Sequence, residues 1–227
     1  MKVNLISYSQ TTDGKNLLDQ VAYAARVSNP ANQNNTETTE KLVRYLIKHQ
    51  HWSPLEMVSV CLEIDTTRDI ARQILRHRSF SFQEFSQRYA DPTKDLGFEV
   101  REARLQDTKN RQNSIEIDDR EIFDEIGGNT VSLKEAWEKT QQSLINKAGS
   151  AYQWAIDNGI AKEQARAVLP EGLTTSRMYM NGTLRSWVHY IQLRSANGTQ
   201  KEHREIAIAC AEAIKPIFPM IEEFISE

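Results

Sequence analysis

Residues 76–89 read RHRSFSFQEFSQRY, and this stretch carries the most chemical information in the chain. Its arginines offer forked N–H donors that match pairs of phosphate oxygens, and its phenylalanines supply flat apolar rings. One interpretation is a phosphate-binding segment beside a surface on which a nucleotide base could stack. The other is a salt-bridged surface helix followed by a loop whose phenylalanines are buried. Composition alone leaves both interpretations open.

The flanking segments predict a strand and a helix. Apolar residues occupy every second position of residues 58–64, which is typical of a half-buried strand. Thr66 or Thr67 can cap a helix that runs to about His77, while residues 79–89 are expected to form a loop. Three arginines spaced four residues apart lie on one face of that helix: Arg68, Arg72 and Arg76.

The remaining segments predict a mixed domain. Strands are expected at residues 2–8, 114–117 and 174–180. Helices are expected at residues 17–27, 36–49, 132–158, 161–169, 184–194 and 199–214. The last two helices begin after an Asn181-Gly182 turn and at a capping box, Thr199 to Glu202. Residues 91–130 form a polar excursion. Residues 1–227 are therefore predicted to be one α+β domain, mainly helical, with a small antiparallel sheet.

Composition limits the class of ligand. The 227 residues carry 28 Lys and Arg against 31 Asp and Glu, a formal net charge of −3. This balance disfavours a long polyanion such as a nucleic acid, whereas the local arginines favour a small anionic ligand. Apolar runs of membrane length and a secretory signal are not seen, so the expected location is the cytoplasm, without a membrane partner.

Cysteine and histidine offer little evidence of a metal or a nucleophile. Cys61 and Cys210 lie far apart and resemble packing residues, and His49 and His51 alone make a weak metal motif. No metal site is predicted. Ser86 could be a nucleophile, but a role in hydrogen bonding a phosphate is favoured.

The stretch at 76–89 resembles the signature of the flavin-dependent thymidylate synthases, RHRxxSxNExSxRY. Gln83 replaces the signature asparagine. Further motifs follow in the same order along the chain: AARVS at 24–28, HWSPLE at 51–56, RLQDTKNRQNS at 104–114, ARAVLP at 165–170, and the arginines Arg185 and Arg194. The resemblance covers the chain except for the variable 91–135 region, where only 104–114 looks like family sequence.

The resemblance implies a fold, a reaction and an assembly. The fold would be that of the thymidylate synthase-complementing proteins. The reaction would convert dUMP to dTMP, with 5,10-methylenetetrahydrofolate as carbon donor and NADPH reducing the substrate through FAD. The assembly would be a homotetramer whose FAD and dUMP sites are shared between subunits.

The resemblance also implies which residues form the sites. FAD would contact Ser53, Arg76, His77, Arg78, Glu84, Thr183, Arg185 and His189, with Ser53 and Glu84 reaching it from a neighbouring subunit. The substrate dUMP would contact Gln73, Ile74, Leu75, Arg76, Glu84, Phe85, Ser86, Gln87, Arg88, Arg166 and Arg194.

The absence of a suitably placed cysteine bears on the mechanism. Carbon 5 of uracil is a poor nucleophile, and without cysteine addition at carbon 6 another activation is needed. A guanidinium at the pyrimidine edge can stabilise negative charge on the ring, and Arg194 is the predicted catalytic residue. Because the chain holds no GxGxxG motif, arginines are expected to replace a Rossmann site for FAD. The alternative hypothesis is an Arg/Phe-rich nucleic-acid-binding module without catalysis.

Overall fold

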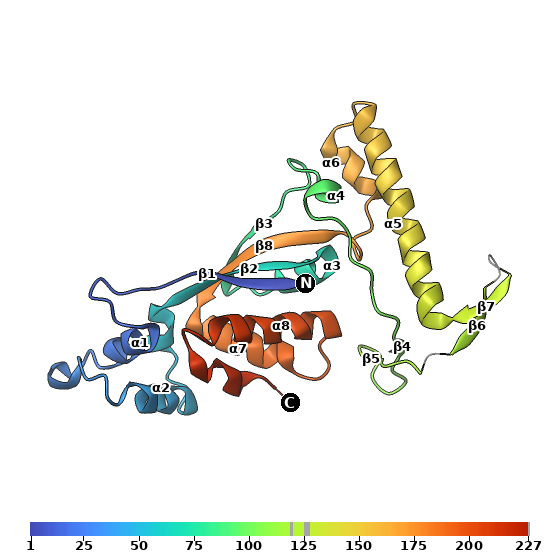
Figure 1. The fold of residues 1–227 in the computed structure, drawn as a ribbon. Coiled ribbons are helices and arrows are strands. Elements are labelled where there is room, and N and C mark those ends of the chain that lie inside the picture. Colours follow the sequence, from blue (N-terminus) through green and yellow to red (C-terminus); the bar gives the residue numbers. More distant parts are fainter. Residues whose placement is uncertain (119, 125–127, 227) are drawn as a thin grey trace.

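A four-stranded antiparallel sheet forms the centre of the molecule (Figure 1). The computed structural model describes residues 1–118, 120–124 and 128–226. The strand order is β1-β2-β8-β3. The strands are β1 (Lys2–Tyr8), β2 (Ser59–Thr67), β8 (Thr175–Thr183) and β3 (Phe80–Glu84). Chain segments distant in sequence therefore meet in one sheet, and the predicted α+β class with a small antiparallel sheet is confirmed.

The alternation predicted at residues 58–64 sets the two faces of the sheet. Val60, Leu62 and Ile64 of β2 are buried, and Met178 and Met180 of the neighbouring β8 join them in the core. The intervening residues of β2 point to the opposite face, because successive side chains of a strand alternate. One face of the sheet is thus apolar and the other polar.

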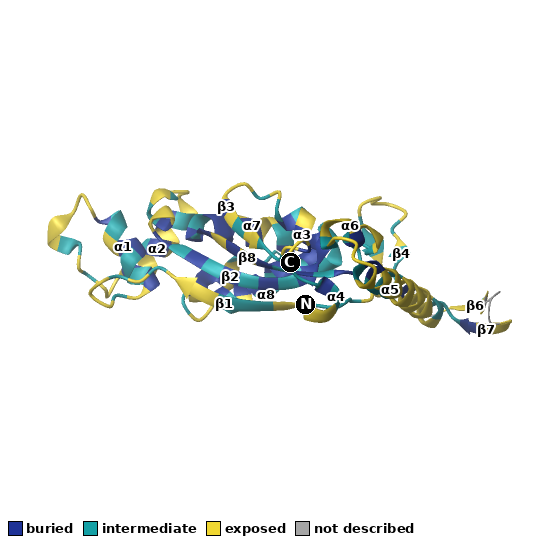
Figure 2. Ribbon diagram, turned by 90° about the horizontal axis from the view of Figure 1, so that it is seen from above, coloured by how far each residue is buried: buried dark blue, intermediate teal, exposed yellow. Residues whose placement is uncertain are grey.

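Three helices cover the apolar face: α3 (Arg68–Ile74), α7 (Leu184–Ser195) and α8 (Lys201–Ile214). Burial concentrates along the sheet and these helices (Figure 2). Trp187 of α7 is fully buried, and its indole Nε1 donates to the Val60 carbonyl at 3.0 Å. The hydrogen bond satisfies the polar atom of a large core side chain, which fixes α7 against β2.

Two helices and three short 3-10 segments pack at the ends of this core. They are α1 (Leu17–Ala25), η1 (Pro30–Asn32), α2 (Thr39–Lys48), η2 (Ser53–Met57) and the C-terminal η4 (Pro219–Phe224). Asn16 begins α1 by accepting the Asp19 backbone N–H at 2.9 Å. Leu17 and Val21 of α1 and Val43 of α2 extend the core beyond the sheet.

A long helical arm projects from the sheet. Its elements are α4 (Pro92–Asp95), β4 (Leu105–Gln106), β5 (Ser114–Ile115), β6 (Glu121–Asp124), β7 (Asn129–Ser132), α5 (Leu133–Asp157), α6 (Lys162–Ala165) and η3 (Arg166–Val168). Ser132 caps α5 as predicted, and Gly159 with φ +78° follows its end. Trp137, Leu144 and Trp154 of α5 are exposed. Figure 1 shows α5 standing away from the sheet.

The prediction of a loop over 79–89 was wrong for its first part. Residues 80–84 form the edge strand β3, which pairs with β8 and places Phe80 opposite Gly182. The alternation of Phe80 and Phe82 with polar residues is the sequence pattern that indicates this strand. In the structure Phe80 is buried and Phe82 packs against the core.

The predicted turn at Asn181-Gly182 was also wrong, because β8 continues through both residues to Thr183. A Cβ atom at Gly182 would overlap the Phe80 ring, so this glycine allows the two strands to pack closely.

The capping box predicted at 199–202 does not form. Helix α8 begins after Gln200 without a side-chain cap, since Glu202 instead binds Arg101 and Arg104.

Other boundaries moved by a few residues. The helix predicted to end at about His77 ends at Ile74, and the strand predicted at 114–117 covers Ser114–Ile115 only. The excursion at 91–130 contains Asp119 and residues 125–127, which lie outside the described residues. Within the described part of the chain, no helix is both long and apolar enough to cross a membrane.

Candidate active site

Arg194 and His77 form the centre of the candidate site. Arg194 lies in the last turn of α7 and His77 follows the end of α3, and the Nε atom of Arg194 donates to Nε2 of His77 at 2.9 Å. Burial, followed by the nearby charges of Arg194 and Arg76, lowers the pKa of His77 to about 4. His77 is therefore neutral at pH 7 and accepts through Nε2, which leaves Nδ1 protonated. The acceptor holds the guanidinium of Arg194 in one orientation.

A buried polar group lies behind this pair. The ring of Tyr190 meets the His77 ring edge-on at 4.9 Å, and its hydroxyl lies 3.1 Å from Nε2 of His203. The Nδ1 atom of His203 lies 3.2 Å from Oε1 of Gln73, the amide predicted to contact dUMP. Burial, with the charges of Arg194, His77 and Arg76, lowers the pKa of His203 to about 3. His203 is fully buried and neutral.

Four of the residues predicted to contact FAD gather at the other end of α7. Thr183 caps the helix by accepting the Ser186 N–H at 3.3 Å, and Arg185 forms an ion pair with Glu56. His189 is exposed, and its ring lies 4.5 Å from the Trp52 ring, beside Ser53. From Thr183 to Arg194 the helix rises roughly 16 Å. Arg185 and His189 share one face of α7, whereas Arg194 lies nine residues after Arg185 and about half a turn round the helix, so the two ends of α7 present separate groups.

Glu84 at the end of β3 belongs to a separate group of predicted residues. Its carboxylate accepts from Ser176 at 2.9 Å and from Arg72 at 3.2 Å, and Arg68 lies 3.7 Å away. Glu171 binds the same two arginines. The arginine face predicted at residues 68–76 is thus partly occupied by carboxylates of this chain.

The residues after Glu84 continue away from the sheet toward α6. Ser86 and Arg88 are exposed, Phe85 is half-buried, and Gln87 is buried with its Nε2 atom lacking a hydrogen-bond partner. Lys162 at the start of α6 donates to the Tyr89 carbonyl at 2.9 Å. Arg166 follows α6 and donates to the Glu163 carbonyl at 3.3 Å. The structure thus brings the predicted residues from 84 to 88 and Arg166 to the side of the arm.

Residues 74–78 differ in how far their side chains are exposed, and so in whether they can contact a ligand. Ile74 is fully buried in the core, so its side chain is directed away from any bound molecule. Leu75 is half-buried and packs against the core, whereas Arg76 and Arg78 are exposed. Of the predicted residues in this segment, the two arginines are the ones whose charged groups face solvent.

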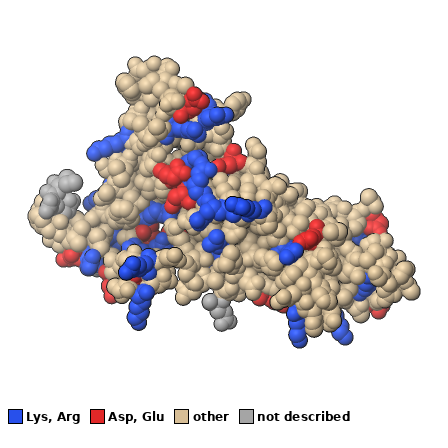
Figure 3. Space-filling view, turned by 180° about the vertical axis from the view of Figure 1, so that it is seen from behind, with Lys and Arg blue, Asp and Glu red and all other residues tan. Residues whose placement is uncertain are grey.

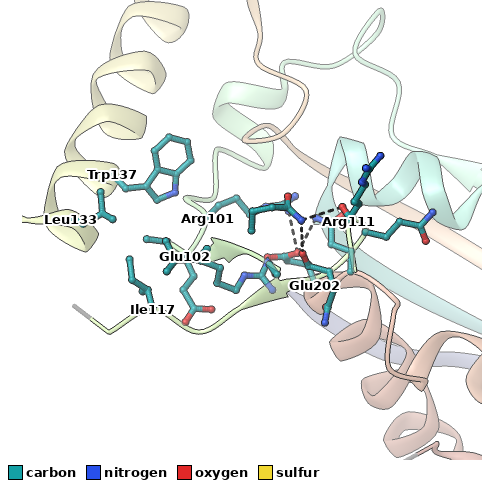
Figure 4. A pocket seen from close by; sticks show the side chains of 15 residues that line it. Arg101, Glu102, Arg111, Ile117, Leu133, Trp137 and Glu202 are labelled. Atoms are coloured by element: carbon teal, nitrogen blue, oxygen red, sulfur yellow. Dashed lines mark hydrogen bonds and ion pairs between the residues drawn. The ribbon is translucent and has the colours of Figure 1, made fainter. Parts of the chain in front are cut away.

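A cavity of about 560 Å³ lies between α5 and the segment from 101 to 117 (Figure 4). Leu133 and Trp137 of α5 form an apolar wall, and Arg101 and Glu202 lie on the opposite side. Gln200 also lines the cavity and accepts a hydrogen bond from Nε2 of Gln73 at 2.7 Å. Through Gln200 the cavity is therefore linked to one predicted dUMP contact, Gln73.

Phe80 and Phe82 of the 76–89 stretch do not form a stacking surface. Phe80 is buried and Phe82 packs against the core, so the interpretation of these rings as a platform for bases was wrong for both. On the face drawn in Figure 3, acidic side chains lie among the basic ones. A mixed surface of this kind favours discrete ion pairs over a continuous basic path for nucleic acid.

The candidate site also contains residues that the sequence analysis did not select. They are Tyr190, Gln200, Glu202, Arg101 and His203, which are joined to Gln73 or to one another by hydrogen bonds or ion pairs. Gln200 and Glu202 were not recognised because Thr199 to Glu202 also matches a capping box.

No group of three or more His, Cys, Asp or Glu side chains suited to a metal ion occurs among the described residues.

Comparison with known proteins gives consistent matches over nearly the whole chain. The family model described as thymidylate synthase complementing protein matches residues 4–220. A protein of Paramecium bursaria Chlorella virus 1 named probable flavin-dependent thymidylate synthase is 44% identical over 97% of both chains. A Synechocystis protein named flavin-dependent thymidylate synthase is 47% identical over 97% of both chains.

Solved structures show the same fold. The UMP/dUMP methylase PolB from Streptomyces cacaoi bound with 5-Br UMP superposes with a TM-score of 0.75 at 25% identity, covering 98% of this chain and 92% of that chain. The same enzyme bound with 5-Br dUMP gives a TM-score of 0.71 at 26% identity, covering 98% and 93%.

Proposed function

The chain belongs to the thymidylate synthase complementing protein family, and from this membership we propose that it is a flavin-dependent thymidylate synthase that methylates dUMP to dTMP. The observation that carries the proposal is the match of 44% and 47% identity to relatives of that name over 97% of each chain. The half-buried pair of Arg194 and His77 supplies a geometry suited to the reaction.

The residues along α7 fit FAD. FAD carries a pyrophosphate, and the forked guanidinium of Arg185 at the start of α7 can bind such a group beside His189 on the same helix face. We assign FAD contacts to Arg76, His77, Arg78, Thr183, Arg185 and His189, and to Ser53 and Glu84 of a neighbouring subunit. When bound, FAD supplies the transfer of reducing equivalents from NADPH, and 5,10-methylenetetrahydrofolate supplies the carbon.

Two separate groups of residues fit a dUMP site shared between subunits. One group, Gln73 to Arg76 with Arg194, lies at the end of α3 and of α7. The other, Glu84 to Arg88 with Arg166, lies toward the arm. We propose that a homotetramer brings the second group of one subunit to the first group of another. The exposed apolar side chains of α5, Trp137, Leu144 and Trp154, support such an assembly, because burial would remove them from water.

Arg194 is the proposed catalytic residue. Its guanidinium, oriented by His77, can stabilise the negative charge that develops on the uracil ring as carbon 5 becomes nucleophilic. Cysteine addition is disfavoured because burial raises the pKa of Cys210 and of Cys61, which keeps both thiols protonated. Two free thiols are also compatible with the cytoplasmic location that we propose.

Anaerobic turnover tests the function. Purified protein supplied with FAD, NADPH, dUMP and 5,10-methylenetetrahydrofolate should form dTMP, and NADPH should bleach the bound flavin. A protein that cannot take up FAD, or that forms no dTMP with FAD bound, would refute the proposal. The nucleic-acid alternative predicts steeply salt-dependent binding to long RNA or DNA, and buried Phe80 does not favour it.

A further inference from the structure

A carboxylate held by two arginines lies at one end of a hydrogen-bonded chain that leads to Gln73. Arg104 forms an ion pair with Oε1 of Glu202, and Arg101 lies 3.4 Å from Oε2 (Figure 4). Burial opposes ionisation of Glu202, but hydrogen bonds from its own backbone N–H, Gln200 and Arg104, with the charge of Arg101, lower the pKa of this carboxyl. Glu202 is therefore an anion, and both of its oxygens can only accept hydrogen bonds.

This fixed acceptor determines the direction of each following hydrogen bond. Gln200 must turn its NH₂ group to Glu202, at 2.9 Å, so its Oε1 faces Gln73. Gln73 must then turn its own NH₂ group to Gln200, at 2.7 Å, so its Oε1 faces His203. A carbonyl oxygen only accepts, so Nδ1 of His203 carries the proton. The neutral ring therefore accepts through Nε2 from the Tyr190 hydroxyl.

The amide of Gln73 has one N–H left after these bonds. Its oxygen is used by His203 and one N–H by Gln200. Gln73 is half-buried rather than enclosed, and it lies four residues before His77, the partner of Arg194. The remaining N–H is therefore available to a molecule bound beside Arg194.

We propose that Glu202, acting through Gln200 and with His203 as a second support, fixes Gln73 as a hydrogen-bond donor that selects uracil over cytosine. The inference rests on the proposed function, since it takes the bound molecule to be a pyrimidine nucleotide. At position 4 uracil carries a carbonyl oxygen, which accepts, and cytosine carries an amino group, which donates. A donor of fixed orientation is satisfied by the first and left unpaired by the second. Glu202 and His203 are positioning residues here.

The isosteric variant Glu202→Gln gives a sharp test because it should reverse the chain. Arg104 would hold the amide oxygen of the new side chain, whose NH₂ would then face Gln200. Each amide would turn over, and Gln73 would present its oxygen to the ligand. The dissociation constants of the FAD-loaded enzyme for dUMP and dCMP, measured by calorimetry, should show the preference for dUMP reduced about tenfold or more. Glu102→Gln is the matched control, because it removes a neighbouring carboxylate that binds Lys201 instead.

A second measurement follows the protons themselves. The ¹⁵N shifts of labelled histidines should show His203 protonated at Nδ1 in the wild type and at Nε2 in Glu202→Gln. A wild-type His203 protonated at Nε2 would overturn the direction of the chain. An unchanged dUMP preference despite a reversed tautomer would overturn the selection. If Glu202→Gln weakened the binding of dUMP and dCMP equally and left the binding of deoxyuridine unchanged, the N–H of Gln73 would contact the phosphate. That result would also overturn the proposed selection of uracil.

Variants of His203 keep the test decisive if Glu202→Gln does not fold. His203→Asn retains an N–H near the position of Nδ1 and should keep the dUMP preference, whereas His203→Leu should lose it. Loss in both variants, or in neither, would count against the proposal. Wild-type enzyme that forms no dTMP would instead refute the proposed function, which separates that failure from failure of this inference.

Discussion

The Nε atom of Arg194 lies 2.9 Å from Nε2 of His77, so the side chain proposed to activate the substrate is held by a neutral histidine from another element. A carboxylate partner would neutralise the guanidinium. A neutral imidazole orients it and leaves its full positive charge available to a developing anion. The burial that makes this arrangement possible also lowers the pKa of Arg194.

Replacing Arg194 by Ala should separate cofactor binding from catalysis. We expect FAD to remain bound and reducible by NADPH, while dTMP formation falls by about 10²-fold or more, because the charge on the ring loses its stabiliser. Flavin absorbance and single-turnover dTMP formation measure the two steps. Arg44→Ala, which removes a surface ion pair with Glu40, is the control and should turn over normally. Normal turnover of Arg194→Ala would remove this residue from the mechanism.

Ser86→Ala should affect substrate binding more than chemistry. Ser86 is exposed, and a hydroxyl that binds a phosphate contributes to dUMP affinity. We expect KM for dUMP to rise about tenfold with a smaller fall in kcat. Complete loss of activity with dUMP still bound normally would favour a nucleophilic Ser86 instead.

Acid should destabilise the fold over the range in which histidines titrate. The pKa of His203 is lowered to about 3 and that of His77 to about 4, below the ordinary value. Below pH 6.5 the unfolded chain therefore binds protons that the folded chain excludes. The stability present above pH 6.5 is lost as the pH falls, at up to about 1.4 kcal/mol per pH unit for the buried His203.

Urea unfolding between pH 5.0 and 6.5 measures this effect above the range in which carboxylates protonate. His203→Asn should flatten the pH dependence, whereas a control at the exposed His49, His49→Asn, should leave it unchanged. A pH dependence that is equally steep in wild type and His203→Asn would show that His203 does not exclude a proton.

Gly182→Ala should destabilise the chain, because the added methyl group would overlap the ring of Phe80 in the paired strand. Overpacking of this kind costs about 1–3 kcal/mol. Gly172→Ala, outside the helices, is the control, since its Cβ would meet nothing within 4 Å. Thermal unfolding of both variants measures the difference, and equal midpoints would show that the sheet relaxes around the methyl group.

Much of the architecture could be predicted from residue pattern. The alternation at 58–64 and the capping serine at 132 gave β2 and the start of α5, because each signal is local. The turn predicted at Asn181-Gly182 failed because the glycine is required by a side chain a hundred residues earlier, Phe80. Local propensity carries no information about such a contact.

The sequence named candidate site residues but not how they are arranged. The signature at 76–89 and Arg194 came from sequence similarity, yet the bond between His77 and Arg194 depends on how α3 and α7 pack. His203 and Glu202 were hidden for the same reason, since tertiary contacts with Gln73, Gln200 and Arg104 define their environment. The assembly of two residue groups into one site stays a prediction.

Helix α7 carries the proposed FAD contacts at one end and Arg194 at the other. An insertion or deletion of a single residue between Arg185 and Arg194 would turn the guanidinium by about 100° around the helix axis and shift it by about 1.5 Å. Such a change would direct the guanidinium away from His77, although the residues at both ends of the helix would stay the same. If Arg194 acts as proposed, a change in the length of α7 should therefore cost more activity than a substitution at one of its exposed positions.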